Sequence, residues 1–116
     1  MSERSVDRLV ADILERIARI KRHVGNISRE SFENDDKTID AVVRNLEVIG
    51  EPANRIPPEF RERHPEIPWR RIVGLRNRIV HEYFDVDLAL VWEIIARELS
   101  LLEAQLIELQ RTIGDS

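Results

Sequence analysis

Apolar residues recur at three- and four-residue steps in three stretches of this chain. The first stretch runs from Val6 to Ile27, the second from Ile39 to Ile49, and the third, which is the most regular, from Leu88 to Ile113. Because a helix turns once in about 3.6 residues, this spacing places apolar side chains on one stripe of a helix. The pattern predicts amphipathic helices in all three stretches, and no stretch has the alternation typical of a strand.

Capping residues and a proline set the expected ends of the first two helices. Ser5 is the predicted N-cap of the first helix and Gly25 its stop. The second helix should start after a cap at Asp35 or Asp36. It should end or kink at Pro52, since proline cannot donate the helical hydrogen bond and clashes with the preceding turn.

The remaining boundaries follow from prolines and aspartates. Residues 55–68 contain four prolines and predict an irregular connection with one helical turn at 59–63. A third helix should begin near Trp69, directly after a proline suited to a first turn. Asp85 or Asp87 is the expected cap of the last helix.

These elements predict an all-α protein, an antiparallel bundle of four to five helices in a single domain over residues 1–116. The apolar stripes are long enough for a second chain to complete the packing. The pattern is therefore compatible with a dimer.

Composition narrows the class of protein. Hydrophobic residues make up 42% and charged residues 34% of the chain, the balance of a folded domain with a charged surface. The chain has no cysteine, which excludes disulfides and thiolate metal sites and suits a reducing cytoplasm. Neither a signal peptide nor a membrane span is apparent, so we expect a cytoplasmic protein without membrane association.

Charge is unevenly distributed along the chain. The net charge is −4, which argues against nucleic-acid binding through overall charge. Residues 61–81 nevertheless carry six arginines against two glutamates. This basic segment fits either a localised site for a polyanion or a solvated helix face.

Arg76 is an anomaly in the predicted third helix. On a wheel of about 100° per residue, the apolar residues between Trp69 and Phe84 form one broad face, and Arg76 falls at its centre. An unpaired guanidinium in an apolar interior costs several kcal/mol. Either Glu47 or Glu51 therefore pairs with Arg76, or the face opens onto a polar cleft in which Arg76 binds an anion.

His81 and Tyr83 lie close to Arg76 in sequence. On a continuous helix Tyr83 would lie about 20° from Arg76, and His81 about 140° away. His81 and Arg76 can meet if the helix ends near Val80 or if a dimer axis joins two chains. The other histidines, His23 and His64, have no such surroundings and read as surface residues, and the three form no metal-ligand spacing.

The spacing Arg76-x4-His81-x-Tyr83, with Asn77 directly after the arginine, resembles the Arg-x4-His-x-Tyr motif of the HEPN superfamily. The chain is particularly similar to the HepT-like toxins of prokaryotic toxin–antitoxin pairs. The likeness extends upstream to Gly50-Glu51 at the end of the second helix, and it covers nearly the whole chain in size and helical pattern. Pro52 departs from the family, whose members usually have a small helix-forming residue there.

The resemblance implies a homodimer whose motifs face a shared cleft and cleave RNA without a metal or other cofactor. It assigns Arg76 and His81 as catalytic residues, with Asn77 in support. It also implies a nucleotidyltransferase antitoxin that silences the toxin by transferring AMP to Tyr83. Histidine moves protons near neutral pH and arginine stabilises a charged phosphate, so the residue types suit this chemistry. The neighbouring arginines would guide the RNA backbone: Arg70, Arg71 and Arg78.

Two other functions remain open from the sequence. The chain could be a non-catalytic HEPN module that binds a nucleotidyltransferase and presents a substrate or nucleotide to it. The acidic net charge and the few aromatic residues favour this alternative, since base-binding proteins stack bases on aromatics. It could also be a structural helical dimer in which Arg76 is merely ion-paired.

Overall fold

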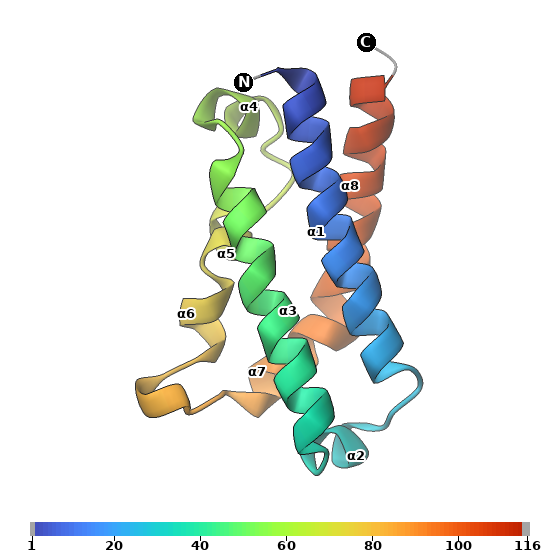
Figure 1. Cartoon of the computed structure of the whole chain (residues 1–116), viewed down its shortest axis with the longest axis vertical. Helices are drawn as coiled ribbons and strands as arrows, with labels where there is room; N and C mark the ends of the chain where they lie inside the picture. Colours follow the sequence, from blue (N-terminus) through green and yellow to red (C-terminus); the bar gives the residue numbers. More distant parts are fainter. Residues whose placement is uncertain (1, 115–116) are drawn as a thin grey trace.

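Three long helices lie side by side in the computed structural model, which describes residues 2–114 apart from the side chain of Phe84 (Figure 1). They are α1 (Glu3–Val24), α3 (Asp36–Arg55) and α8 (Leu99–Gly114), and α1 runs antiparallel to the other two. Shorter elements join them: α2 (Arg29–Glu33), α4 (Pro58–Arg63), α5 (Trp69–Val73), α6 (Leu75–Ile79), the 3-10 turn η1 (Glu82–Phe84), α7 (Leu88–Glu93) and the π-helical segment η2 (Ile94–Glu98).

The predicted all-α bundle is confirmed, because the described residues form helices and only one isolated β-bridge. No helix within residues 2–114 is long and apolar enough to cross a membrane.

The core is built from the apolar stripes that the sequence pattern marks. Helix α1 packs against α3 and α8, and an ion pair of 2.6 Å between Lys21 and Glu103 also joins α1 to α8. Burial of each aliphatic side chain stabilises the folded state by about 1.5–3 kcal/mol, before the cost in conformational entropy is subtracted. The fully buried members at the centre of the bundle include Ile13, Ile17, Leu46, Ile49 and Leu106.

The helix caps agree with the sequence except at the first helix. Ser2 is the N-cap of α1 and accepts a hydrogen bond from the Ser5 backbone N–H at 3.1 Å, so the prediction of Ser5 as the cap is wrong. The apolar stripe starts at Val6, but Ser5 fits in the first turn and the helix extends further. Gly25 ends the helix at φ 53°, a conformation that glycine adopts without steric cost. Asp35 caps α3 as expected.

Helix α3 does not end at Pro52. It continues to Arg55, so the predicted end of the helix at this proline is wrong. Pro52 lies in the last turn, where only one internal hydrogen bond is lost to the missing N–H. The side chain is buried in the bundle, as is that of Ala53, and this packing stabilises the final turn.

The predicted helix from Trp69 to Phe84 is instead two short helices and a loop. Helix α5 gives way to α6 at Gly74, whose φ of −88° and ψ of 9° depart from helical values. Helix α6 ends at Ile79, and Val80 is already extended. The β-branched Val80 pairs with Val86 in the isolated bridge, and this pairing competes with continuation of the helix.

The cap of α3 makes a specific acid sensitivity testable. The Asp35 carboxylate accepts hydrogen bonds from the Thr38 hydroxyl at 2.8 Å and from its backbone N–H at 3.1 Å, and these bonds lower the pKa of Asp35 from 3.8. A folded-state pKa below the unfolded value means that the stabilisation is present above about pH 4 and is lost as the pH falls through the folded pKa.

We expect Asp35→Asn, which retains a capping side chain, to lose less stability than the wild type between about pH 4 and pH 2. Thermal unfolding of both proteins across this range measures the difference. Parallel loss of stability in the two proteins would contradict the role of Asp35.

Candidate functional site

A polar cleft of about 670 Å³ opens between α1, α3 and the α5–α6 segment. We call it the arginine cleft, because Arg16 of α1, Arg44 of α3 and Arg76 of α6 all line it, together with Asn77. The carboxylates of Glu47 and Glu51 lie in the same cleft. A cleft of this size and mixed polarity can hold a small charged ligand.

Arg76 is exposed at this cleft and does not lie in the apolar interior. The break at Gly74 restarts the helix, and Leu75 and Ile79 then take the buried positions one turn apart, with 4% and 0% exposure. The wheel drawn through a continuous helix therefore placed Arg76 wrongly. Among the described residues no carboxylate lies within 4.0 Å of its guanidinium. Of the two alternatives for Arg76, the ion pair with Glu47 or Glu51 is therefore not formed, and the side chain opens onto a polar cleft.

The floor of the cleft is one face of α3. Arg44, Glu47 and Glu51 follow one another at spacings of three and four residues, which places them on the same side of the helix. Gly50 lies on this side too, and a Cβ atom added there would be 3.2 Å from the Val73 carbonyl oxygen. The glycine thus lets α3 approach the end of α5 closely, and this contact sets the distance between the floor and Arg76.

The chain reverses direction immediately after α6. Val80 and Val86 face each other in the antiparallel bridge, and the His81 N–H donates to the Asp85 carbonyl at 2.7 Å. A second bond, from the Asp87 N–H to the Ile79 carbonyl, measures 2.8 Å. We call residues 80–86 the hairpin. It projects from one end of the bundle, at the lower left of Figure 1.

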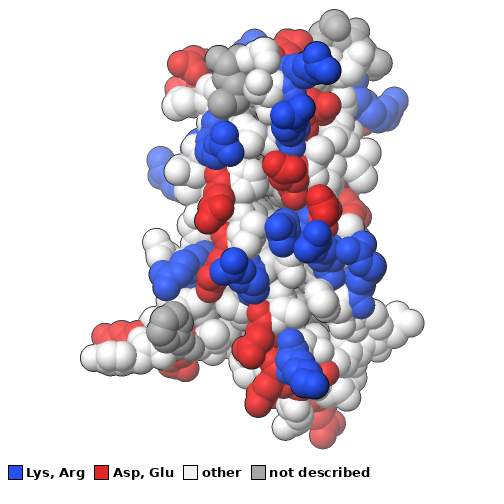
Figure 2. Space-filling view, in the orientation of Figure 1, with Lys and Arg blue, Asp and Glu red and all other residues white. Residues whose placement is uncertain are grey.

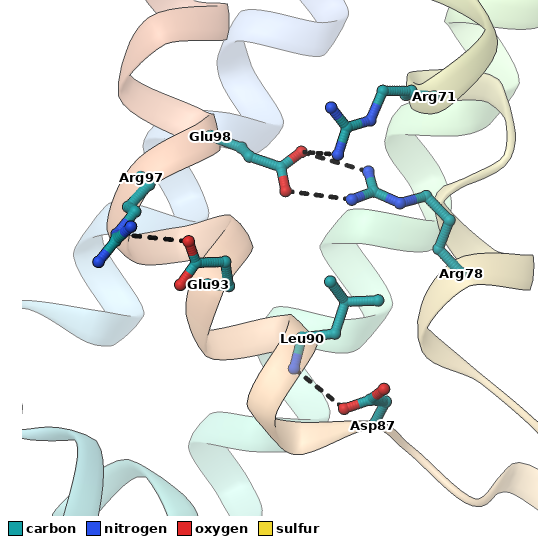
Figure 3. Close-up of polar contacts among 7 residues, drawn as sticks. All are labelled: Arg71, Arg78, Asp87, Leu90, Glu93, Arg97 and Glu98. Atoms are coloured by element: carbon teal, nitrogen blue, oxygen red, sulfur yellow. Dashed lines mark hydrogen bonds and ion pairs between the residues drawn. The ribbon is translucent and has the colours of Figure 1, made fainter.

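The hairpin holds His81 next to a carboxylate. The His81 Nε2 atom lies 3.7 Å from Oδ2 of Asp87, and the histidine side chain is 55% exposed. This distance is too long for a hydrogen bond, but it is within the range of an ion pair. The other oxygen of Asp87 caps α7 by accepting from the Leu90 N–H at 3.0 Å, as Figure 3 shows, so the carboxylate is anchored.

Tyr83 lies at the tip of the hairpin. It has φ 53° and ψ 40°, the left-handed conformation that is uncommon outside glycine, and it is 96% exposed. The expectation that Tyr83 shares an apolar face with Arg76 is therefore wrong, because the helix that would have carried both residues ends at Ile79. Phe84 was expected on the same apolar face, but its side chain is outside the part of the chain that the structure describes.

Two of the three arginines expected to guide RNA are tied to a glutamate. Arg78 bonds both oxygens of Glu98, at 3.3 and 3.1 Å, and Arg71 lies 3.3 Å from the same carboxylate (Figure 3). Glu98 belongs to the π-helical turn η2, whose wider spacing changes the direction of side chains relative to an α-helix. Arg70 is exposed on α5.

Glu98, Arg71 and Arg78 form a cluster that joins η2 to α5 and α6, and its loss should destabilise the protein. Glu98 and Arg78 are both mostly shielded from solvent, with 32% and 22% exposure, and the contact is bidentate. We expect Glu98→Gln to lower the free energy of unfolding by about 1 kcal/mol in urea denaturation. Glu93→Gln breaks only the exposed pair with Arg97 and is the matched control, with little expected change. Equal effects of the two substitutions would contradict a special role for Glu98.

Sequence reasoning missed several of these residues. Asp87 carried a signal as a helix cap, but its approach to His81 depends on the hairpin. Glu98, Arg16 and Arg44 had no local signal, because each is defined by a partner on another element. Within residues 2–114 no three His, Asp or Glu side chains are grouped to hold a metal ion, and the arginines of the cleft suit an anion.

On the face that Figure 2 draws, acidic and basic side chains are interleaved. Figure 2 shows basic and acidic side chains alternating over the face formed by α1 and α3, while acidic and uncharged side chains cover the projecting hairpin. A ligand that binds this surface through charge must therefore be recognised locally.

Comparisons with known proteins match this chain to one family and to several relatives. Residues 13–109 match the family described as "Ribonuclease HepT-like". A protein of Caldanaerobacter subterraneus named "Putative RNase" is 41% identical over 84% of this chain and 87% of its own. A "Probable ribonuclease HepT" of Thermococcus cleftensis is 37% identical over 94% and 99% of the two chains. A "Putative RNase" of Methanocaldococcus jannaschii is 36% identical over 90% and 96%. No solved structure matches the chain significantly.

Proposed function

Since the chain belongs to the HepT-like ribonuclease family, we propose that it is a metal-independent endoribonuclease whose catalytic residues are Arg76 and His81. One observation carries the proposal. Arg76 lies in a polar cleft without a carboxylate partner among the described residues, and the chain that leaves its helix presents His81 beside Asp87. A free guanidinium and a proton-transfer group thus come from the same short segment.

The chemistry requires two tasks that these residues can perform. In RNA cleavage the 2′-oxygen attacks the phosphorus and the bond from phosphorus to the 5′-oxygen breaks. The 2′-hydroxyl gives up its proton, and the departing 5′-oxygen takes one. His81 moves one of these protons, and Asp87 lies beside it at 3.7 Å. Arg76 stabilises the charge that builds up on the phosphate, and Asn77 beside it donates a further hydrogen bond.

We propose that the active form is a homodimer. Arg76 lies in the arginine cleft, whereas His81 and Tyr83 stand on the hairpin and do not line that cleft. A second chain could bring its hairpin to the cleft of the first. The apolar side chains of Leu101 and Tyr83, exposed by 63% and 96%, are consistent with surfaces that a partner covers.

The direct test is cleavage of a fluorescently labelled single-stranded RNA by the purified chain in excess EDTA. We expect cleavage to persist in EDTA. In size-exclusion chromatography we expect the nuclease activity in the fractions that contain the dimer. Protein that is free of bound partner and still leaves RNA intact would contradict the assignment as an enzyme.

We also propose that this nuclease is the toxin of a toxin–antitoxin pair, silenced by a nucleotidyltransferase antitoxin that adds AMP to Tyr83. The phenolic oxygen would attack the α-phosphorus of ATP, releasing pyrophosphate and the phenolic proton. The exposure of Tyr83 at the tip of the hairpin supports access by such an enzyme. In the proposed dimer, AMP on Tyr83 would bring bulk and negative charge to the cleft of the other chain, which must admit RNA phosphate.

Intact mass spectrometry of the chain isolated with its partner tests this modification. The expected result is a mass increase in AMP units that Tyr83→Phe abolishes. An unmodified chain that the partner nevertheless inhibits would contradict silencing through Tyr83.

The mixed charge of the surface favours a second candidate, a non-catalytic module that binds a nucleotidyltransferase. On the face shown in Figure 2, the described basic side chains are interrupted by acidic ones and form no continuous basic track for a nucleic acid. A complex that transfers AMP to an external substrate, while the free chain cleaves no RNA, would support this function.

A further inference from the structure

The arginine cleft holds guanidinium groups that are free to bind an anion. Arg16, Arg44 and Arg76 enter it from three different helices, and within residues 2–114 none of them lies within 4.0 Å of a carboxylate. Arg78 and Arg71, in contrast, already share Glu98. Binding a phosphate through either of those two requires breaking an existing pair, whereas the cleft offers its arginines without that cost.

Arg16 is held in place by an unusual residue. Its Nη1 atom donates to Oδ1 of Asn45 at 3.3 Å, and the Asn45 amide donates to the Ala41 carbonyl at 2.8 Å. Asn45 is 6% exposed and is the only buried polar side chain among the described residues. An amide in an apolar interface destabilises a protein unless its groups are bonded, and an aliphatic residue would pack there at less cost. The arrangement is explained if Asn45 serves to orient Arg16.

The rest of the cleft suits a nucleotide better than a free anion. Glu47 and Glu51 repel a bare phosphate, but their oxygens can accept hydrogen bonds from ribose hydroxyls. The volume of about 670 Å³ is within the range of sites that bind small ligands. Arginines for the phosphate and carboxylates for the sugar are therefore close together.

We infer that the arginine cleft binds the sugar–phosphate backbone of single-stranded RNA, with Arg16 and Arg44 as additional phosphate-binding residues and Asn45 as a positioning residue for Arg16. This inference rests on the proposed ribonuclease function. It extends the substrate site from the motif on α6 across to α1 and α3. A strand bound there would lie along the floor formed by α3 and reach Arg76 at the other side.

The experiment measures binding of a fluorescent single-stranded RNA by anisotropy, in an otherwise unchanged His81→Ala chain that cannot cleave its ligand. Arg16→Gln and Arg44→Gln should each raise Kd about ten-fold, as expected for loss of a hydrogen bond to a charged group. Each should also reduce the dependence of log Kobs on log salt by about 0.7, the value for one lost contact to single-stranded phosphate. Arg22→Gln is the matched control, because Arg22 is exposed on α1 and lines no part of the cleft.

The variant Asn45→Leu tests whether RNA binding depends on the orientation of Arg16 as well as on its charge. It removes the contact to Oδ1 and leaves the net charge unchanged, so it should weaken RNA binding several-fold with no loss of thermal stability. Normal RNA binding by Asn45→Leu would overturn the role of Asn45. A DNA strand of the same sequence should bind more weakly than RNA, and Glu47→Gln with Glu51→Gln should reduce that preference.

The outcomes distinguish this inference from the proposed function. Suppose that the wild-type chain cleaves RNA and that Arg16→Gln binds RNA as tightly as Arg22→Gln. This result would overturn the assignment of the cleft and would still support the proposed ribonuclease function. RNA binding that depends on Arg16, without cleavage by the wild-type chain, would support the cleft and contradict the catalytic roles. Weakened binding of the nucleotidyltransferase by Arg16→Gln, with RNA binding unchanged, would also overturn the inference and assign the cleft to a protein partner.

Discussion

Replacing His81 with alanine is expected to lower the rate of RNA cleavage by about 10²–10⁴-fold, the usual contribution of a general acid or base. The side chain is 55% exposed, and its only ionic contact among the described residues is the one to Asp87 at 3.7 Å. Its removal should therefore leave the fold unchanged. Initial rates on a labelled single-stranded RNA, measured together with thermal unfolding, test both expectations.

A histidine elsewhere on the surface provides the control for this prediction. His23 is exposed in the last turn of α1 and does not line the arginine cleft, so His23→Ala should cleave RNA at the wild-type rate. Asp87→Asn should reduce the rate less than His81→Ala, since it removes the neighbouring charge and keeps the imidazole. Full activity in His81→Ala would show that proton transfer in this protein belongs to another group.

Replacing Gly50 with valine is expected to lower the free energy of unfolding by about 2–3 kcal/mol, within the range for overpacked positions. A Cβ atom there would already be 3.2 Å from the Val73 carbonyl oxygen, and valine adds two methyl groups to it. The obstacle is backbone rather than a flexible side chain, so α3 and α5 must move apart. Because α5 leads through Gly74 into α6, this movement should displace Arg76 and impair cleavage as well.

Urea denaturation measures the stability change, and Gly114→Val is the matched control. Gly114 lies in α8, and a Cβ atom added there would meet nothing within 4 Å, so only the modest helix preference of valine should register. Equal stability of the two variants would mean that the contact between α3 and α5 can relax without cost. Normal cleavage by Gly50→Val would separate the packing of α3 from the position of Arg76.

The bundle itself was predictable, because an apolar stripe needs only the period of the helix and a partner to pack against. The buried residues of α1 from Val6 to Ile20, and those of α8 from Leu99 to Leu109, are the ones that the spacing marks. Two further caps were narrowed to Asp35 or Asp36 and to Asp85 or Asp87, since an aspartate before an apolar run satisfies the free N–H groups of the first turn. The structure has Asp35 and Asp87 as these caps. These features depend on near neighbours along the chain.

The site was less predictable, because the segment that carries it is not one helix. The wheel for residues 69–84 assumed one continuous rotation, but Gly74 resets the phase and the bridge between Val80 and Val86 ends the helix. Arg76 was consequently predicted at a core position, whereas it is exposed in the structure. The helix does end near Val80, which was one of the two ways left open for His81 to reach Arg76. His81 nevertheless does not line the cleft of Arg76 in the same chain, so a dimer that joins the two residues stays a proposal.

By itself, then, the sequence determined the helical class and the core stripes, and its motif is the basis on which Arg76, His81 and Tyr83 are proposed as site residues. Only the tertiary structure decided which arginines are free and which are paired, because Glu98 reaches Arg78 across twenty positions of the chain and Asn45 reaches Arg16 across twenty-nine. Local spacing reports which side chains share a face of one helix. Whether a charge meets a partner, a cleft or water depends on which other helix packs beside it, and that is settled when the whole core forms.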